Sequence, residues 1–191
     1  MGHQSQPRVV HFNTSKGWGG GEQQVYELVR GSEAVGVRAT LLARPRGALL
    51  QRCRALPGAD VRAFDFGWKY SPVTIARLCR ILRDCGAEVL AVHDSRAVNA
   101  GVLAATAIGL PVVLHRRISS PVRTGLPSRY IYRAQCIQRY VAVSEAARQG
   151  LLRGGIDRSK TRVVLSGLDF QRVLRQGGRE AMRRELGWGD H

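Results

Sequence analysis

Arg8-Val-Val-His-Phe-Asn13 runs directly into Thr14-Ser-Lys-Gly-Trp-Gly-Gly-Gly-Glu22, and this stretch decides the fold. Its first six residues are apolar and β-prone, which predicts a buried strand, and the glycine-rich loop opens a helix with apolar positions at Val25, Leu28 and Val29. Such a loop can bind a phosphate, because glycines let backbone N–H groups approach an anion and the helix N-terminus is partly positive. The spacing matches neither the dinucleotide fingerprint nor a P-loop, so a tight turn that binds nothing is the alternative.

Strand-like and helix-like segments alternate along the rest of the chain. Short apolar runs, typical of buried parallel strands, recur at residues 38–43, 61–66, 89–93, 111–115, 139–143 and 162–165. Between them, amphipathic or small-residue patterns predict helices at 71–83 and 95–108, and Ser144 is a candidate N-cap for a helix that ends at Gly154-Gly155. The small residues of 95–108 indicate close packing on a sheet. This alternation predicts an α/β fold with a Rossmann-like parallel sheet and helices on both faces.

Composition limits the class of protein. The chain has 191 residues, 44% hydrophobic and 23% charged, which is enough for one packed domain. The formal charge of +16 attracts phosphates, anionic lipid headgroups or nucleic acid. The four cysteines show neither Cys-x-x-Cys pairs nor metal-ligand spacing, and the first residues lack the pattern of a secretory signal. We therefore expect reduced thiols, no metal site and a cytoplasmic location. Within the cytoplasm, the protein could also bind peripherally to the inner face of the cell membrane.

Several ordered motifs resemble the N-terminal domain of a GT-B-type retaining glycosyltransferase of family 4. The resemblance covers nearly the whole chain and rests on a glycine loop, a strand ending in histidine, a Pro-Val-Val strand, a Val-Ser-Glu segment, a Gly-x-Asp turn and a terminal helix: residues 19–22, 91–94, 110–115, 141–145, 163–169 and 179–187. Two departures stand out. Ser166 replaces the usual asparagine, and His115 comes earlier after Pro111 than in many members.

The resemblance implies a domain plan and partners. Residues 1–167 would form the acceptor-side half of the GT-B fold, and residues 168–191 a linker and helix that lead to a C-terminal donor-binding domain, which the sequence does not contain. We expect a truncated product or one subunit of a split enzyme, inactive alone. The implied partners are a nucleotide-sugar donor, a sugar or glycolipid acceptor and the missing domain in cis or in trans. An anionic membrane surface is added on account of the charge, and neither a cofactor, a metal ion nor nucleic acid is expected.

The same resemblance points to a set of site residues. His115 takes the catalytic position, where it would position or polarise groups near the donor sugar without acting as a nucleophile. The expected donor- and acceptor-binding residues are Gly19, Gly20, Gly21, Glu22, Lys16, His93, Arg116, Arg117 and Ser144. Each has a structural alternative: a tight turn, a histidine bonded to backbone, a solvated basic loop or a helix cap. His11 lies inside the first strand and is interpreted as structural.

A non-enzymatic basic module that binds nucleotides or nucleic acid is the competing hypothesis. The sequence shows no helix-turn-helix, RNA-binding aromatic signature or zinc motif, and only 6% of its residues are aromatic, which is little for stacking on bases. The Gly-x-Gly-x-x-Gly fingerprint of a stand-alone dinucleotide-binding domain is also missing.

Overall fold

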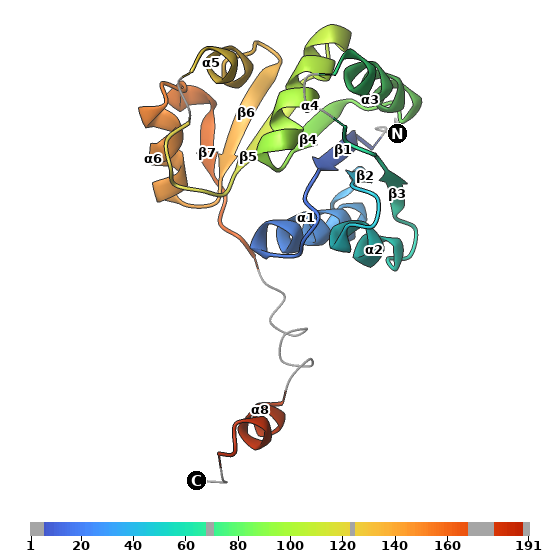
Figure 1. Cartoon of the computed structure of the whole chain (residues 1–191), viewed down its shortest axis with the longest axis vertical. Coiled ribbons are helices and arrows are strands. Elements are labelled where there is room, and N and C mark those ends of the chain that lie inside the picture. The colour runs from blue at the N-terminus through green and yellow to red at the C-terminus, as the bar shows by residue number, and fades with distance from the viewer. Residues whose placement is uncertain (1–5, 68–70, 123–124, 168–177, 189–191) are drawn as a thin grey trace, which may run out of the picture.

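The computed structural model describes residues 6–67, 71–122, 125–167 and 178–188. Within them, seven strands form one fully parallel sheet in the order β3-β2-β1-β4-β5-β6-β7 (Figure 1). Their bounds are β1 (Arg8–Asn13), β2 (Arg38–Ala43), β3 (Asp60–Ala63), β4 (Val89–Val92), β5 (Val112–Arg116), β6 (Ile137–Ala142) and β7 (Thr161–Val163). The predicted parallel α/β sheet is confirmed.

Helices connect successive strands. They are α1 (Gly20–Gly31), α2 (Ala48–Arg54), α3 (Pro72–Asp84), α4 (Ser95–Ile108), α5 (Leu126–Tyr132) and α6 (Glu145–Arg153), with short 3-10 turns at Glu33–Val35 and Arg158–Lys160. A further helix, α8 (Arg179–Glu185), follows the last strand. The sequence did not predict α2 and α5, which have seven residues each. Such short helices bury too few side chains to show a clear period. None of the helices within the described residues is long and apolar enough to span a membrane.

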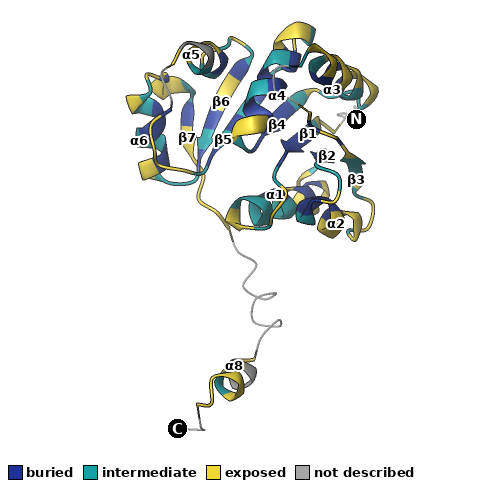
Figure 2. Cartoon of the chain, in the orientation of Figure 1, coloured by how far each residue is buried: buried dark blue, intermediate teal, exposed yellow. Residues whose placement is uncertain are grey.

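Apolar clusters lie on both faces of the sheet, as the sequence predicted, and Figure 2 shows the buried residues concentrated in the strands and the helix sides that face them. The larger cluster joins one face of β1, β4, β5 and β6 to α3, α4, α5 and α6. The smaller cluster joins β2 to α1 and α2. Its buried members come from these three elements, and Trp18, Leu56, Ala59 and Val61 pack beside them. Among the described residues this cluster does not extend over β5, β6 and β7.

Close packing of α4 on the sheet is confirmed at one glycine. A Cβ atom on Gly101 would lie 2.8 Å from Val92 Cγ1 and 3.3 Å from Leu90 Cδ2, with Phe12 Cδ1 at 3.5 Å. The missing side chain therefore lets α4 lie directly on β1 and β4. This contact lies near the middle of α4 and fixes how closely the helix approaches the sheet.

The strand order reverses between β1 and β4. The chain runs from β1 outward to β2 and β3, and returns to β4 on the other side of β1. In open α/β sheets ligands bind at such a switch point, outside the carboxyl ends of the strands. The loop after β1, the start of α4 and the end of β5 meet there. The expected domain boundary at residue 167 stays a prediction, because residues 168–177 lie outside the described part of the chain.

Candidate functional site

Three histidine side chains stack on one another toward the carboxyl ends of β1, β4 and β5. The His11 Nδ1 atom lies 3.0 Å from His93 Nε2, and these two rings are nearly parallel with centroids 5.2 Å apart. The His115 ring follows, with its centroid 4.3 Å from that of His93. His11 and His93 are buried, whereas His115 is half-buried. The stack thus runs from the sheet interior to its accessible edge.

The side chain of Arg117 holds the middle ring. Its Nη1 donates to the backbone carbonyl of His93 at 2.8 Å, and its Nη2 lies 2.9 Å from His93 Nδ1. Its Nε donates to Gln24 Oε1 at 2.8 Å, which ties the end of β5 to α1. A guanidinium group has no acceptor, so His93 Nδ1 accepts. The His93 proton therefore sits on Nε2 and points to His11 Nδ1, which accepts in turn.

The surroundings keep these rings uncharged. Burial, and then the Arg117 charge, lower the pKa of His11 to about 4 and that of His115 to about 3, with His11 adding to the effect on His115. Burial and the neighbouring rings lower the pKa of His93 well below its ordinary value. Burial also lowers the pKa of Arg117, and Glu22 and Asp94 oppose that shift. An isolated imidazole titrates near neutral pH and is positively charged in mild acid. The rings of this stack stay neutral under the same conditions.

The glycine loop presents bare backbone at the start of α1. Gly19 is the N-cap in an extended conformation and no side chain caps this end, so the first N–H groups of α1 have no intrahelical acceptor. A Cβ on Gly20 would meet nothing within 4 Å, and one on Gly21 would touch Arg117 Cδ at 3.4 Å. None of these glycines has a positive φ. The turn itself therefore does not require them, and they leave room at the helix terminus.

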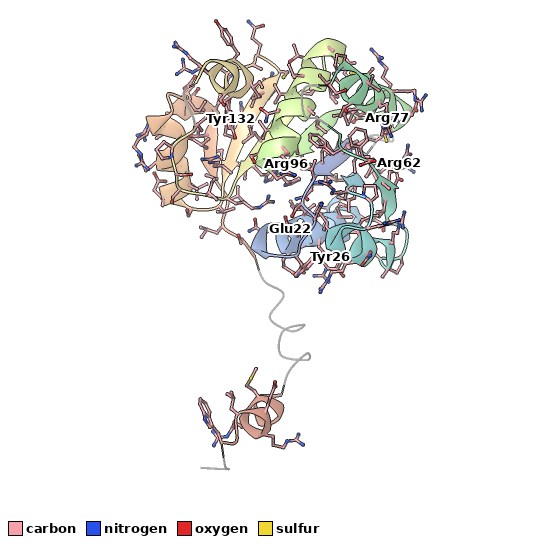
Figure 3. All side chains as sticks on the ribbon, in the orientation of Figure 1. Glu22, Tyr26, Arg62, Arg77, Arg96 and Tyr132 are labelled. Carbon is pink, nitrogen blue, oxygen red and sulfur yellow. The ribbon has the colours of Figure 1, made fainter. Side chains whose placement is uncertain are left out.

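Asp94 links this loop to α4. Its Oδ1 accepts from the backbone N–H groups of Arg96 and Ala97 at 2.9 and 3.0 Å, which caps the helix. The carboxylate also accepts from the backbone N–H and the hydroxyl of Thr14. A shallow pocket of about 320 Å³ lies here, lined by Thr14, Ser15, Lys16, Asp94 and Arg96. Glu22 at the start of α1 and Arg96 at the start of α4 both belong to this edge (Figure 3).

The structure gives other tasks to some predicted site residues. Arg116 is buried, and its Nη2 donates to the Ser120 carbonyl, so its side chain holds the loop after β5 and does not face the open edge. The Ser144 hydroxyl accepts from the Ala147 N–H at 3.2 Å and caps α6, as the sequence also predicted. These contacts are structural ones, and a role of any of the predicted residues in binding a ligand stays a prediction.

The ring of Trp18, in the loop after β1, already has two neighbours in the structure. The Arg52 guanidinium lies 4.0 Å from its centroid, and Tyr26 packs against it edge to face. Trp18 thus serves the α1–α2 packing.

Sequence reasoning missed His11 and Gln24 as parts of this site. His11 was interpreted as structural because a histidine inside an apolar strand gives no sign of its partner. Its register with Ala91 of β4 could have placed it on the same face as His93, two residues farther on. No group of three or more His, Cys, Asp and Glu side chains in the described part of the chain is placed to hold a metal ion.

Comparison with known proteins identifies the family. The family model described as Glycosyltransferase Family 4 matches residues 18–172, which is most of the chain. This chain belongs to glycosyltransferase family 4. The resemblance found in the sequence motifs is therefore confirmed. Among curated proteins, no significant match to this family 4 chain is found.

Solved structures share the fold at low sequence identity. The chain superposes on Anabaena Alr3699/HepE in complex with UDP-glucose with a TM-score of 0.73 and 17% identity, covering 94% of this chain and 50% of that one. A glycosyltransferase from Rickettsia africae gives 0.78 and 12%, covering 97% and 51%. Acinetobacter baumannii MurG gives 0.58 and 17%, covering 90% and 50%. The family 4 chain thus matches about half the length of these proteins and has the fold of one half of a GT-B enzyme.

Proposed function

We propose that this domain is the acceptor-side half of a retaining glycosyltransferase, which moves a sugar from a nucleotide-sugar donor to a glycolipid or polysaccharide acceptor. One observation carries the proposal. On a family 4 domain, the uncapped N-terminus of α1, the Arg117 guanidinium and the His115 ring meet at the carboxyl edge of the sheet. That edge is where open α/β sheets bind their ligands.

The start of α1 suits the diphosphate of the donor. Its first N–H groups are not bonded within the helix, and the open space at Gly20 lets an anion reach them. Lys16 and Arg96 are exposed beside the same loop and add positive charge. In this proposal these groups neutralise the diphosphate, so no metal ion is assigned a role.

The His115 ring suits a sugar hydroxyl. No hydrogen bond from the described residues reaches it, and its half-buried position leaves it accessible from the edge. A neutral imidazole offers one donor and one acceptor, which is the pattern a hydroxyl matches. His115 would orient the donor sugar or the acceptor, and no side chain of this domain is assigned the role of nucleophile.

A second domain is needed to close the site, and apolar surface on this half supports its docking. Val163, Val164 and Leu165 are 37, 55 and 75% exposed at the end of the last strand. Parallel sheets are normally covered on both faces, yet the α1 side of β5 to β7 lacks a packed apolar cluster in the part of the chain described. We assign this surface to a C-terminal GT-B domain, supplied in cis or in trans.

An anionic membrane surface is the proposed setting, on the cytoplasmic side. Ile118 and Tyr130 are 56 and 75% exposed near α5 and α6. Arg129, Arg133 and Arg153 are exposed on the same helices or directly after them. Apolar side chains among arginines favour adsorption to anionic headgroups, and a glycolipid acceptor would be reached there.

A reconstitution assay tests the proposal. The 191-residue chain is fused at its end to the C-terminal domain of a GT-B glycosyltransferase, and release of nucleoside diphosphate is followed with UDP- and GDP-sugars and a lipid-linked acceptor. We expect transfer by the fusion and none by the domain alone, because half a cleft cannot hold donor and acceptor together. Robust transfer by the isolated chain would contradict the division into halves. Tight nucleic-acid binding without sugar transfer by any fusion would favour the basic binding module.

A further inference from the structure

The contact between Arg117 and His93 does more than hold a loop. Arg117 is a permanent donor, and its Nη2 faces the one nitrogen of His93 that is not directed at His11. The direction of each hydrogen bond in the row is therefore set from one end. Arg117 Nη2 donates to His93, and His93 donates to His11.

We propose that Arg117 is a positioning residue that fixes the tautomers of His93 and His11 and adds its charge to the burial that disfavours protonation of the stack, His115 included. The proposal rests on three contacts: the Arg117–His93 and His93–His11 hydrogen bonds and the stacking of His115 on His93. With Arg117 in place, a proton added to His93 would leave its Nδ1–H facing a guanidinium N–H.

The charges around the stack come from several elements. Glu22 of α1 and Asp94 at the start of α4 act on Arg117 and keep it charged. Gln24, also of α1, accepts from Arg117 Nε and fixes its orientation. No carboxylate in the described residues makes a hydrogen bond to any ring of the stack, and the formal charge that lowers the pKa of all three rings is that of Arg117. Burial is the larger cause of the lowered pKa of all three rings, and the Arg117 charge acts in the same direction.

The consequence for His115 is a defined hydrogen-bonding pattern at the open edge. A neutral ring keeps one acceptor nitrogen, whereas an imidazolium has donors only. An uncharged hydroxyl of a sugar ring fits the neutral form, and Arg117 itself retains unused N–H groups for an anion. The role of His115 toward a sugar hydroxyl rests on the proposed function, but the protonation of the rings can be measured without any turnover.

The test is nitrogen-15 NMR of the histidine rings in the 191-residue chain between about pH 5 and 8, with long-range proton–nitrogen correlations that distinguish the two ring nitrogens. In the unmodified chain we expect His93 to carry its proton on Nε2 and all three rings to stay neutral over this range. Arg117→Met should mix the His93 tautomers. It should also raise the protonation midpoint of at least one ring by about 1 pH unit or more.

Two variants separate the contributions. Arg117→Lys keeps the charge but loses the planar fork, so the midpoints should stay low while the tautomers mix. Arg96→Met removes an exposed arginine from the same edge and should change neither the tautomer of His93 nor the protonation midpoints. The proposal is overturned if His93 carries its proton on Nδ1 in the unmodified chain. It is also overturned if Arg117→Met lowers the melting temperature while tautomers and midpoints stay the same, since Arg117 would then be a structural tie only. Neither result would bear on sugar transfer by the fused enzyme.

Discussion

Asp94 and Thr14 are joined twice across the switch point of the sheet, because the Asp94 carboxylate accepts from both the backbone N–H and the hydroxyl of Thr14. The same carboxylate caps α4, so one side chain sets the position of the glycine loop and of the helix beside it. Both residues lie eighty positions apart in the sequence. The Asp94 carboxylate therefore joins the two halves of the ligand edge, beside the contacts that Arg117 makes with Gln24 and His93.

Removal of that connection should cost more than the loss of an ordinary helix cap. Asp94→Ala deprives α4 of its cap and leaves the buried Thr14 without a partner, so we expect a loss of about 3 kcal/mol in unfolding free energy. Ser144→Ala removes a cap that accepts one bond and should cost about 1 kcal/mol. Urea unfolding followed by circular dichroism measures both. Equal losses would mean that the Thr14 contacts contribute nothing.

The buried histidines should make stability depend on pH. The pKa of His11 falls from 6.5 to about 4 on folding, so below pH 6.5 the unfolded chain binds more protons than the native one. This contribution is present above the unfolded pKa and is lost as the pH falls from about 6.5 toward 4. Between pH 7 and 5 a shift of this size corresponds to a loss on the order of 2 kcal/mol. His115 acts in the same direction.

A matched variant isolates the effect of His11. His11→Asn keeps an oxygen acceptor for the His93 Nε2–H but cannot titrate, so its unfolding free energy should fall less steeply between pH 7 and 5. Denaturation curves at each pH provide the measurement, and surface carboxylates titrate alike in both proteins. Parallel curves for the two proteins would show that His11 is not a buried neutral group.

Gly101 should resist even the smallest added side chain. Alanine is the better helix former, yet its Cβ would overlap Val92 Cγ1, so Gly101→Ala should cost about 1–3 kcal/mol. Gly31→Ala is the control, because a Cβ at the end of α1 meets nothing within 4 Å and should be neutral or slightly stabilising. Thermal unfolding of both variants tests the expectation. A stabilised Gly101→Ala would show that α4 can move away from the sheet at little cost.

Binding to membranes should follow charge and salt. With a net charge of +16, the chain should sediment with vesicles that contain phosphatidylglycerol and much less with pure phosphatidylcholine vesicles, and added salt should weaken binding. Tyr130→Asp should reduce the bound fraction further, since it replaces a ring that is 75% exposed among arginines. Val35→Asp, in the 3-10 turn after α1, is a control at an apolar position that is also 75% exposed and does not belong to α5. Equal binding to both vesicle types would exclude the membrane proposal.

Much of the fold could be predicted from the sequence because its strands are buried on both faces and appear as short apolar runs. The edge strands were predicted less well. The run at 61–66 was interpreted as one strand, yet β3 ends at Ala63, and Phe64 and Phe66 fill the core beyond it. Pairing sets this limit, since β2 ends at Ala43 and offers no ladder farther on.

Only those residues of the candidate site that belong to recognisable sequence motifs could be predicted. His93, His115 and the glycine loop were found because each follows or ends a strand at the ligand edge. The roles of Arg117 and His11 were not, because they depend on side chains that lie 93 and 82 residues away in the sequence. Arg116 and Arg117 are neighbours with the same chemistry, yet Arg116, the last residue of β5, turns into the domain and Arg117, directly after the strand, turns toward α1.

The final prediction concerns His115 and Gly20 in a chain fused to a donor-binding domain. His115→Ala removes a half-buried ring that makes no hydrogen bond to the described residues, so the melting temperature should change little while the rate of transfer falls about tenfold or more.

Gly20→Val should also leave the fold intact, because Gly20 has neither a positive φ nor a neighbour within 4 Å. Its branched side chain would still cover the N–H groups at the start of α1 and weaken donor binding, which appears as a raised KM. Gly125→Val is the control, since that glycine is equally open but precedes α5, away from the loop. Initial rates per folded molecule, measured beside thermal unfolding, separate a ligand contact from a structural role. If His115→Ala and Gly20→Val keep the rates of the parent fusion, this edge of the sheet does not bind the substrates.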